Sequence, residues 1–161
     1  MVNCKRKLYL IVGTPGAGKS TYLKEKNYVT ESHITISRDA IRFSIVKEDE
    51  EYFSHEKEVY NEFIKQIKNA LKFYKEIYVD ATHLNERSRA RILRSLGTSI
   101  ENIEINAIAV RTSLNRCIEQ NEQRKGTRAY VPPKVIETMY SQLTLPSKEE
   151  GFEHIYIIEN N

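Results

Sequence analysis

The sequence predicts an α/β domain in which helices cover both faces of a parallel five-stranded sheet. Short apolar runs suited to buried strands alternate along the chain with segments of helical periodicity, a pattern typical of parallel sheets with right-handed crossovers. A glycine-rich loop follows the first apolar run and leads into a helix. The 161 residues fit one such domain, spanning residues 1–161, with enough apolar content for a core.

The strands are predicted from apolar runs that end in turn residues. We expect them at residues 8–12, 33–37, 77–79, 103–110 and 155–158. Ligands of such sheets bind beyond the carboxyl ends of the strands. The glycine-rich loop, Asp39 and Asp80 each follow one of these runs, so we expect them on the same rim of the sheet.

The helices are expected between these strands, at residues 21–26, from 37 through 42, 52–74, 85–96, 112–123 and 132–143. Asn85 and Thr112 can cap two of them, Gly97 can end one, and Pro132 with Pro133 can start the last. The longest helix carries an apolar stripe at 3.6-residue spacing, which indicates packing in the core. The stripe consists of Tyr60, Phe63, Ile64, Ile67, Leu71 and Tyr74.

Residues 13–21 match the phosphate-binding loop, or P-loop, in its expected context between a strand and a helix. Its glycines allow backbone N–H groups to face an anion, and the positive end of the helix dipole adds to that field. Lys19 is expected to reach the β- and γ-phosphates of a nucleoside triphosphate, Ser20 to ligate Mg²⁺, and Thr21 to help hold the α-phosphate. The predicted triphosphate site consists of Gly13, Thr14, Pro15, Gly16, Ala17, Gly18, Lys19, Ser20 and Thr21.

Asp39 follows the second strand and is the candidate general base. A carboxylate there could accept a hydroxyl proton and orient that oxygen for in-line attack on the γ-phosphate. The alternative is a helix N-cap, a role open to Ser37 or Asp39. Arg42 lies one helical turn further on, where it could bind an acceptor phosphate in bidentate fashion or pair with Asp39.

Basic residues surround a glycine between two expected helices, at residues 123–130. A mobile segment around residues 124–131 could close over the triphosphate as a lid. Arg124 and Arg128 would then stabilise the charge that develops during phosphoryl transfer. The alternative is a solvated surface loop.

Asp80 and Arg89 complete the candidate site. Asp80 stands at a strand end like the acid of a Walker B motif, but Ala81 replaces the second acid of a hydrolytic ATPase. Arg89 falls toward the buried side of its helix near the rim, where it requires an anionic partner such as Asp80 or a bound phosphate. The outer side of that helix could contact nucleic acid or be a solvated face, and it carries Arg87, Arg91 and Arg94.

Composition disfavours several other classes of protein. Cys4 and Cys117 are too few for a disulfide framework or a zinc site and are expected to be free thiols in a reducing compartment. No apolar run is long enough to span a membrane, so we expect a cytoplasmic protein without a membrane partner. The formal charge of +3 at pH 7 permits a polyanionic partner without requiring one. The histidines share no metal-ligand spacing and are expected at surface or packing positions; they are His33, His55, His83 and His154.

Taken together, four stretches resemble the 5′-polynucleotide kinase family of P-loop phosphotransferases. They are residues 13–21, 37–42, 79–84 with Arg89, and 124–139, and their order and spacing match the family across nearly the whole chain. The resemblance implies a P-loop kinase fold. It also implies an ATP-dependent enzyme that uses Mg²⁺ to transfer the γ-phosphate to the 5′-hydroxyl end of RNA or DNA.

The same resemblance implies roles for individual residues. Asp39 would be the general base, and Lys19, Arg124 and Arg128 would act on the transferred phosphate, with Arg128 as a contact to the donor phosphates. Arg42, Asp80 and Arg89 would lie on the substrate side, with Arg42 on the acceptor's phosphate. His83 departs from the family pattern, in which asparagine often follows Asp-x-Thr.

Other functions are compatible with parts of this pattern. A similar Asp-x-x-Arg arrangement occurs in kinases of nucleosides, metabolites and antibiotics, so a small hydroxylated acceptor is the alternative. Such an enzyme should have a closed pocket, whereas an oligonucleotide needs an open basic channel leading from Asp39. A nucleotide-dependent switch is disfavoured, because the sequence lacks an Asn-Lys-x-Asp motif and a second acid after Asp80.

Overall fold

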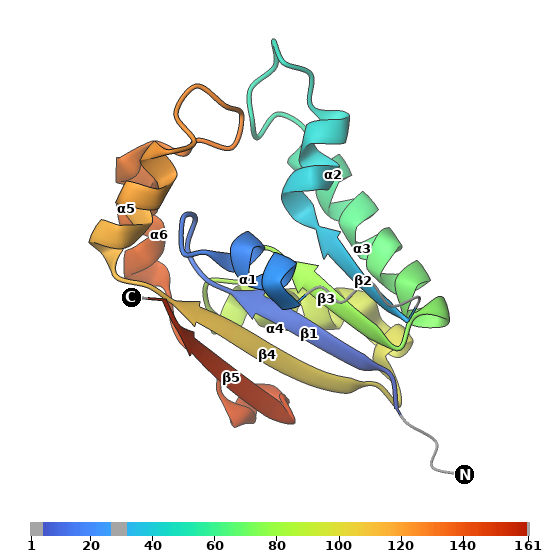
Figure 1. The fold of residues 1–161 in the computed structure, drawn as a ribbon. Helices are drawn as coiled ribbons and strands as arrows, with labels where there is room; N and C mark the ends of the chain where they lie inside the picture. Colours follow the sequence, from blue (N-terminus) through green and yellow to red (C-terminus); the bar gives the residue numbers. More distant parts are fainter. Residues whose placement is uncertain (1–4, 27–31, 161) are drawn as a thin grey trace.

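Five parallel strands form the sheet of this protein, whose computed structural model describes residues 5–26 and 32–160. The strands are β1 (Lys7–Val12), β2 (His33–Ser37), β3 (Glu76–Asp80), β4 (Glu104–Arg111) and β5 (His154–Glu159). They lie in the order β2-β3-β1-β4-β5, and every neighbouring pair is parallel (Figure 1). The predicted five-stranded parallel sheet is therefore confirmed. Cys4, predicted to be a free thiol, lies outside the described residues.

Helices cover both faces of this sheet, as predicted. They are α1 (Lys19–Lys26), α2 (Arg38–Ile45), α3 (Glu56–Phe73), α4 (Glu86–Leu96), α5 (Leu114–Glu122) and α6 (Pro133–Gln142), with short 3₁₀ turns η1 (Gly97–Ile100) and η2 (Lys148–Glu150). The cluster with α3 and α4 packs on one face, and α1, α5 and α6 pack on the other. In the described part of the chain, every helix is too short or too polar to cross a lipid bilayer.

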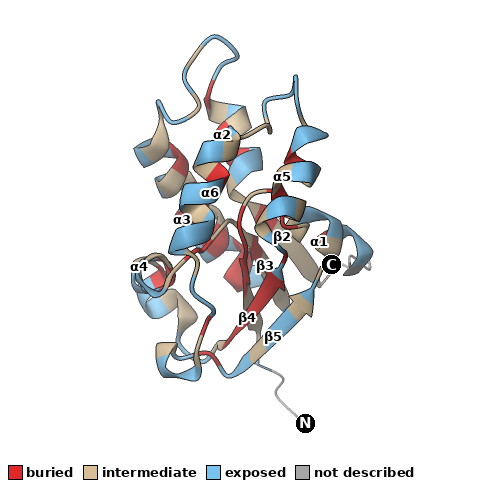
Figure 2. Ribbon diagram, turned by 90° about the vertical axis from the view of Figure 1, so that its left-hand side faces the viewer, coloured by how far each residue is buried: buried red, intermediate tan, exposed pale blue. Residues whose placement is uncertain are grey.

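The core lies on both sides of β1. Leu8 and Leu10 point into the cluster beneath α3 and α4, while Ile11 points into the cluster beneath α1, α5 and α6. Because both faces of the sheet are covered, the sequence of β1 is a nearly continuous apolar run. Figure 2 shows buried residues concentrated on the central strands. Phe63 and Ile67 of α3 are fully buried, so the predicted role of the α3 stripe in packing is confirmed. Burial of each such side chain contributes about 1.5–3 kcal/mol to the free energy of folding.

Local hydrogen bonds explain where the helices begin. Asn85 caps α4 and forms a capping box with Ser88, as the sequence pattern indicated. The predicted cap of α5 is wrong by one residue: Ser113 caps the helix, because the Thr112 hydroxyl instead donates to the Ala17 carbonyl in the P-loop. The predicted start of the long helix at residue 52 is also wrong, since residues 52–55 form turns and α3 begins at Glu56.

Candidate active site

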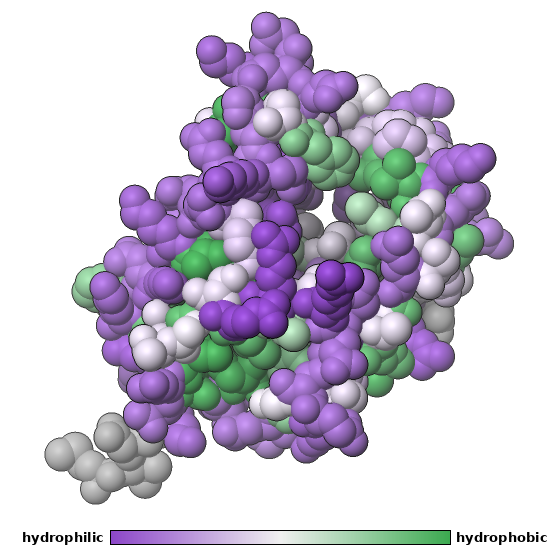
Figure 3. Space-filling model, turned by 180° about the vertical axis from the view of Figure 1, so that it is seen from behind, coloured by the Kyte–Doolittle hydropathy of each residue, from purple (hydrophilic) through white to green (hydrophobic). Residues whose placement is uncertain are grey.

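A cavity of about 510 Å³ lies beyond the carboxyl ends of the central strands. One wall is formed by α2 and the turn before α3, and the other by α6 and the connection from α5 to α6. Figure 3 shows from behind that the molecule is hollowed between these two walls and that hydrophobic side chains border the hollow. The predicted residues that line this cavity are Pro15, Gly16, Gly18, Lys19, Ser20, Asp39, Arg42, Asp80, Arg124 and Arg128.

Two glycines of the P-loop have backbone conformations that other residues rarely adopt. The φ angles are +80° at Gly16 and +98° at Gly18. A Cβ atom at Gly16 would lie 2.3 Å from the carbonyl oxygen of Cys117, and one at Gly18 would lie 2.5 Å from Nδ2 of Asn160. The loop can therefore take this shape only with glycine at both positions.

The far end of the chain holds the P-loop in place. The Ala17 carbonyl accepts hydrogen bonds from the Thr112 hydroxyl at 2.7 Å and from Nδ2 of Asn160 at 2.8 Å. Thr14 and Ala17 are buried behind the loop, and the Thr14 hydroxyl lies 3.2 Å from Sγ of Cys117, which is a free thiol as predicted. Gly13 and Thr21 also lie outside the cavity lining.

Lys19 begins α1 and faces the cavity. Its Nζ donates to the carbonyls of Gly13 and Thr14, at 2.9 Å each. Burial lowers the pKa of Lys19, and the negative charges of Asp80 and Asp39 oppose that shift. Lys19 therefore lies within electrostatic range of both predicted carboxylates, at the position where the P-loop would present an anion.

Asp80 and Ser20 form a pair that suits a magnesium ion. Burial raises the pKa of Asp80, opposed by Lys19 and by the hydrogen bond from the Ser20 side chain. A carboxylate and a hydroxyl are hard oxygen ligands, and Mg²⁺ is commonly held by one or two such groups together with substrate phosphates. The two side chains thus fit the predicted metal, and Asp80, which the sequence analysis had placed on the substrate side, could serve as a second ligand.

Asp39 is not a helix cap. The cap of α2 is Ser37, whose side chain accepts from the backbone N–H of Ala40. The Asp39 carboxylate instead accepts a close hydrogen bond from Nη1 of Arg42 and one from the Tyr52 hydroxyl at 2.6 Å. The N-cap role that the sequence left open to Ser37 or Asp39 therefore belongs to Ser37. Asp39 lines the cavity instead.

Arg42 is buried and is bound mainly by a residue that the sequence analysis missed. Its Nε and Nη2 donate to the two carboxylate oxygens of Glu56, at 2.7 and 3.1 Å. Nη1 also donates to the Tyr52 hydroxyl at 2.8 Å. Burial is the largest single influence and would lower the pKa of Arg42, but hydrogen bonding to Glu56 together with the charges of Glu56 and Asp39 and the nearby Tyr52 raises it overall, so the charge of Arg42 is retained. Nothing in the local sequence pattern marks Tyr52 or Glu56, because both reach the site through the packing of α3 on α2.

The two basic residues of the α5–α6 connection have different surroundings. Arg128 donates to the carbonyls of Phe43 at 3.3 Å and Val46 at 2.5 Å, at the end of α2, and its guanidinium lies 4.9 Å from the centre of the Phe43 ring. Arg124 lines the cavity, and its positive charge contributes to lowering the pKa of Lys19. Arg124 thus faces the P-loop, while Arg128 joins the two walls.

The predicted partner of Arg89 is wrong. Arg89 is fully buried and pairs with Glu150, with Nε–Oε1 and Nη2–Oε2 distances of 2.8 and 3.1 Å, rather than with Asp80 or a bound phosphate. It also donates to the backbone carbonyls of His83 and Thr144 at 2.9 Å each. Because these groups surround the guanidinium and Arg89 does not line the cavity, its role is to join α4 to the segment before β5.

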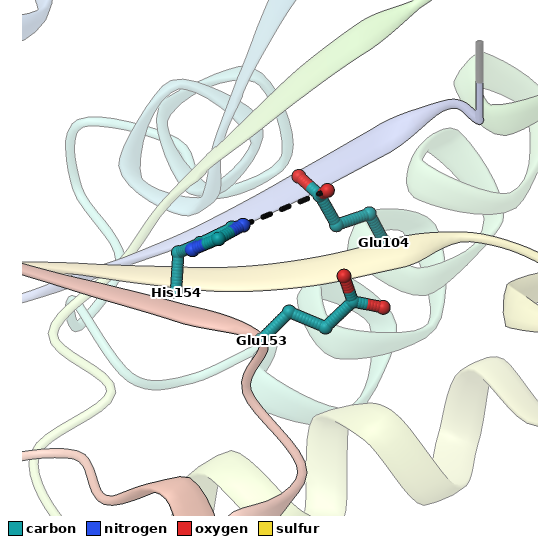
Figure 4. A group of neighbouring side chains, drawn as sticks. All are labelled: Glu104, Glu153 and His154. Atoms are coloured by element: carbon teal, nitrogen blue, oxygen red, sulfur yellow. Dashed lines mark ion pairs between the residues drawn. The ribbon is translucent and has the colours of Figure 1, made fainter.

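None of the histidines in the described part of the chain lines the cavity. His83 is buried, and its Nδ1 lies 2.7 Å from the Ile11 carbonyl. His154 lies 3.8 Å from Glu104 and beside Glu153, at the opposite end of the sheet from the cavity (Figure 4). Strand pairing creates this last group from residues far apart in the sequence. Because two of its members are exposed and it lies away from the cavity, we assign it no part in the chemistry.

Comparison with known proteins agrees with this geometry. A family model described as "AAA domain" matches residues 8–146. No curated protein sequence matches the chain. Among solved structures, a chain of the Pnkp1/Rnl/Hen1 RNA repair complex is 20% identical, with a TM-score of 0.74, and the match covers 88% of this chain and 45% of that one. The present chain therefore spans less than half the length of its match in that complex.

Other solved structures share the fold at lower identity. A fungal RNA kinase is 13% identical with a TM-score of 0.66, covering 100% of this chain and 77% of that one. A gluconokinase from Sinorhizobium meliloti 1021 is 15% identical with a TM-score of 0.55, covering 96% and 84%. The predicted P-loop kinase fold, of the type found in polynucleotide kinases, is thus confirmed. The chain belongs to the AAA domain family, and its fold is that of the kinase-type P-loop enzymes.

Proposed function

We propose that this protein transfers the γ-phosphate of ATP to the 5′-hydroxyl end of RNA or DNA. The observation that carries the proposal is the position of Asp39. Its carboxylate lines the same cavity as Lys19 and Ser20 and lies close enough for its charge to act on Lys19. A carboxylate in that position can accept the proton of an alcohol and aim its oxygen at a phosphate held by the P-loop.

One group of residues binds the donor triphosphate, and another binds the acceptor hydroxyl. The P-loop amides and Lys19 hold the β- and γ-phosphates, and Arg124 faces the same charge from the opposite wall. Ser20 and Asp80 would hold Mg²⁺, which would supply positive charge to offset the negative charge of the phosphates. Asp39 binds the acceptor hydroxyl and takes its proton as the new P–O bond forms and the bond to the leaving ADP breaks. Arg42 also lines the cavity, where its positive charge would attract an acceptor phosphate.

The acceptor side of the cavity favours the terminal nucleoside unit of a nucleic acid over a free sugar. Tyr52 and Phe53 line one wall, and Val131, Val135 and Met139 line the other. Phe53 is 58% exposed, so its ring is available for stacking. Aromatic and aliphatic walls suit the faces of a nucleobase, whereas a polyhydroxylated acid would require a denser set of hydrogen-bonding groups. The likeness to solved RNA kinases adds support for this acceptor.

A kinase of a small hydroxylated acceptor is the second candidate, and one contact favours it. Arg128 joins the two walls through the carbonyls of α2, so this part of the cavity is bridged rather than open. A nucleoside or other small alcohol could fit beneath such a bridge without an extended channel.

Transfer of labelled phosphate separates the two candidates. The protein is incubated with γ-labelled ATP and Mg²⁺ and offered a 5′-hydroxyl oligonucleotide, its 5′-phosphorylated counterpart as a control, or a panel of nucleosides and sugars. We expect label on the 5′-hydroxyl oligonucleotide alone, with an apparent affinity that falls steeply as salt increases. Label on small molecules alone would reject the polynucleotide assignment and support the second candidate.

Replacement of Asp39 tests the proposed base. The variant Asp39→Asn should bind ATP as the native protein does but lose about 100-fold or more of the transfer rate. An active Asp39→Asn protein would show that Asp39 is not the base, whichever acceptor is used.

A further inference from the structure

Tyr52 is fixed at the edge of the cavity by several contacts. Its hydroxyl lies 2.6 Å from Oδ1 of Asp39 and 2.8 Å from Nη1 of Arg42. Its ring lies beneath the Arg42 guanidinium, 4.4 Å from ring centre to Cζ, and meets the Phe53 ring edge to face at 4.6 Å. Few rotamers can satisfy all of these contacts, so the hydroxyl position is well defined.

Counting protons gives the direction of each hydrogen bond. Arg42 can only donate, so the Tyr52 oxygen accepts from Nη1 and the single hydroxyl proton points to Asp39. Burial, with the nearby charge of Asp39, raises the pKa of Tyr52, so the phenol keeps its proton across the working range of pH. Tyr52 is therefore a permanent donor to the carboxylate.

Both donors act on the same oxygen. The Tyr52 hydroxyl and Nη1 of Arg42 each bind Oδ1, while Oδ2 of Asp39 has no hydrogen bond to a described residue. The Asp39 side chain is 57% exposed, so packing alone does not restrict its rotation. These two hydrogen bonds hold Oδ1 and leave Oδ2, on a residue that lines the cavity, as the oxygen that can meet an acceptor.

We infer that Tyr52 is a positioning residue that holds the Asp39 carboxylate with Oδ2 directed at the acceptor hydroxyl, an inference that rests on the proposed function of Asp39 as the base. The transition state of phosphoryl transfer is loose, so aiming the attacking oxygen contributes more than the strength of the base. Arg42 cannot do this alone, because Glu56 draws its guanidinium in another direction.

The variant Tyr52→Phe tests the inference, because it removes the hydroxyl and leaves the ring over Arg42. We expect kcat to fall about tenfold with the KM for ATP unchanged, since a charge-assisted hydrogen bond used in positioning is lost. The other charged groups facing Asp39 are Arg42, Lys19 and Asp80, and they are the same in both proteins.

Tyr60→Phe is the matched control. Tyr60 lies on α3, and its hydroxyl makes a hydrogen bond of 2.7 Å to Ser95 outside the cavity. This variant should keep the native kcat and the native KM for ATP. Unfolding curves of both variants establish that the two proteins are folded.

Two results for the Tyr52→Phe variant would contradict the inference. A Tyr52→Phe protein with the native kcat would overturn the inference, and so would a protein of reduced stability whose KM for ATP rises as its kcat falls. The labelled-phosphate assay on the native protein shows separately whether the proposed acceptor is wrong. If only a small alcohol is phosphorylated, the comparison of Tyr52→Phe with Tyr60→Phe is made on that acceptor.

Discussion

Gly16 is the residue at which the P-loop tolerates the least change. A side chain there would be strained by the positive φ and would also collide with the backbone carbonyl of Cys117, which cannot move aside like a flexible side chain. We therefore expect Gly16→Ala to lower the affinity for ATP more than about tenfold, because the N–H groups of the loop are displaced.

Gly151 is a control that separates the effect of steric collision from the effect of backbone strain. Gly151 has a φ of +104° but open space around its missing Cβ, so Gly151→Ala should cost only about 1 kcal/mol of stability and leave ATP binding intact. Calorimetric titration with ATP and urea unfolding of both variants provide the comparison. Equal losses of ATP affinity in both variants would contradict the explanation given for Gly16.

His83 links the stability of the fold to pH. Its Nδ1 must carry the proton, because the Ile11 carbonyl can only accept, and burial lowers the pKa of His83 to about 4. In the unfolded chain this imidazole binds a proton near pH 6.5. As the pH falls from about 6.5 to about 4, only the unfolded chain gains that proton, so the free energy of unfolding should decrease by up to about 3 kcal/mol.

The variant His83→Asn isolates this effect, because asparagine tolerates the φ of +45° at this position and does not titrate. Urea unfolding at neutral pH and at about pH 4 should show a smaller loss of stability on acidification in the variant than in the native protein. The carboxylates titrate in both proteins, so the difference between the two losses is the quantity of interest. Identical losses would show that His83 is protonated within the folded protein.

At the scale of elements, Arg89 couples α4 to the segment that precedes β5. Burial is the largest single influence on the pKa of Glu150 and would raise it, but the hydrogen bonds from Arg89 and Ser147 together with the charge of Arg89 lower that pKa overall. Removing one partner leaves a buried charge uncompensated, so Arg89→Met should lower the free energy of unfolding by about 3–5 kcal/mol.

The exposed Arg87, on the same helix, is the control for Arg89. Arg87→Ala should change stability by less than about 0.5 kcal/mol in urea unfolding. In the double variant Arg89→Met with Glu150→Leu, part of the lost stability should return, because no lone charge remains. A stable Arg89→Met protein that had lost ATP affinity would instead return Arg89 to the substrate site.

These elements also show what the sequence could and could not predict. The P-loop, the five strands and the cap at Asn85 depend on local patterns, and all three were predicted correctly. The partner of Arg89 lies 61 residues away, and the support for Ala17 from Asn160 spans 143 residues. Tyr52 and Glu56 reach Asp39 and Arg42 only because α3 packs on α2, and the 3.6-residue period of α3 carries no information on which polar residues precede its first turn.

At the scale of the whole molecule, Arg128 joins the two walls of the cavity. Arg128 binds the last carbonyls of α2, where the negative end of the helix dipole attracts a cation. Donor phosphates would compete with these carbonyls for the guanidinium, and phosphate is the stronger partner. If residues 124–131 act as a lid, we expect ATP to withdraw Arg128 from α2.

The variant Phe43→Trp makes this withdrawal visible. The chain contains no tryptophan, so the new side chain is the only one of its kind, and it keeps an aromatic ring in position to face the Arg128 guanidinium. We expect ATP with Mg²⁺ to change its fluorescence, and we expect that change to disappear when Arg128→Ala is added, because no cation then leaves the ring. The variant Lys19→Ala, added to Phe43→Trp, controls for changes in fluorescence caused by nucleotide that is not bound at the P-loop. An unchanged signal in a Phe43→Trp protein that calorimetry shows to be saturated with ATP would mean that Arg128 stays on α2, and the lid would then have to act through Arg124.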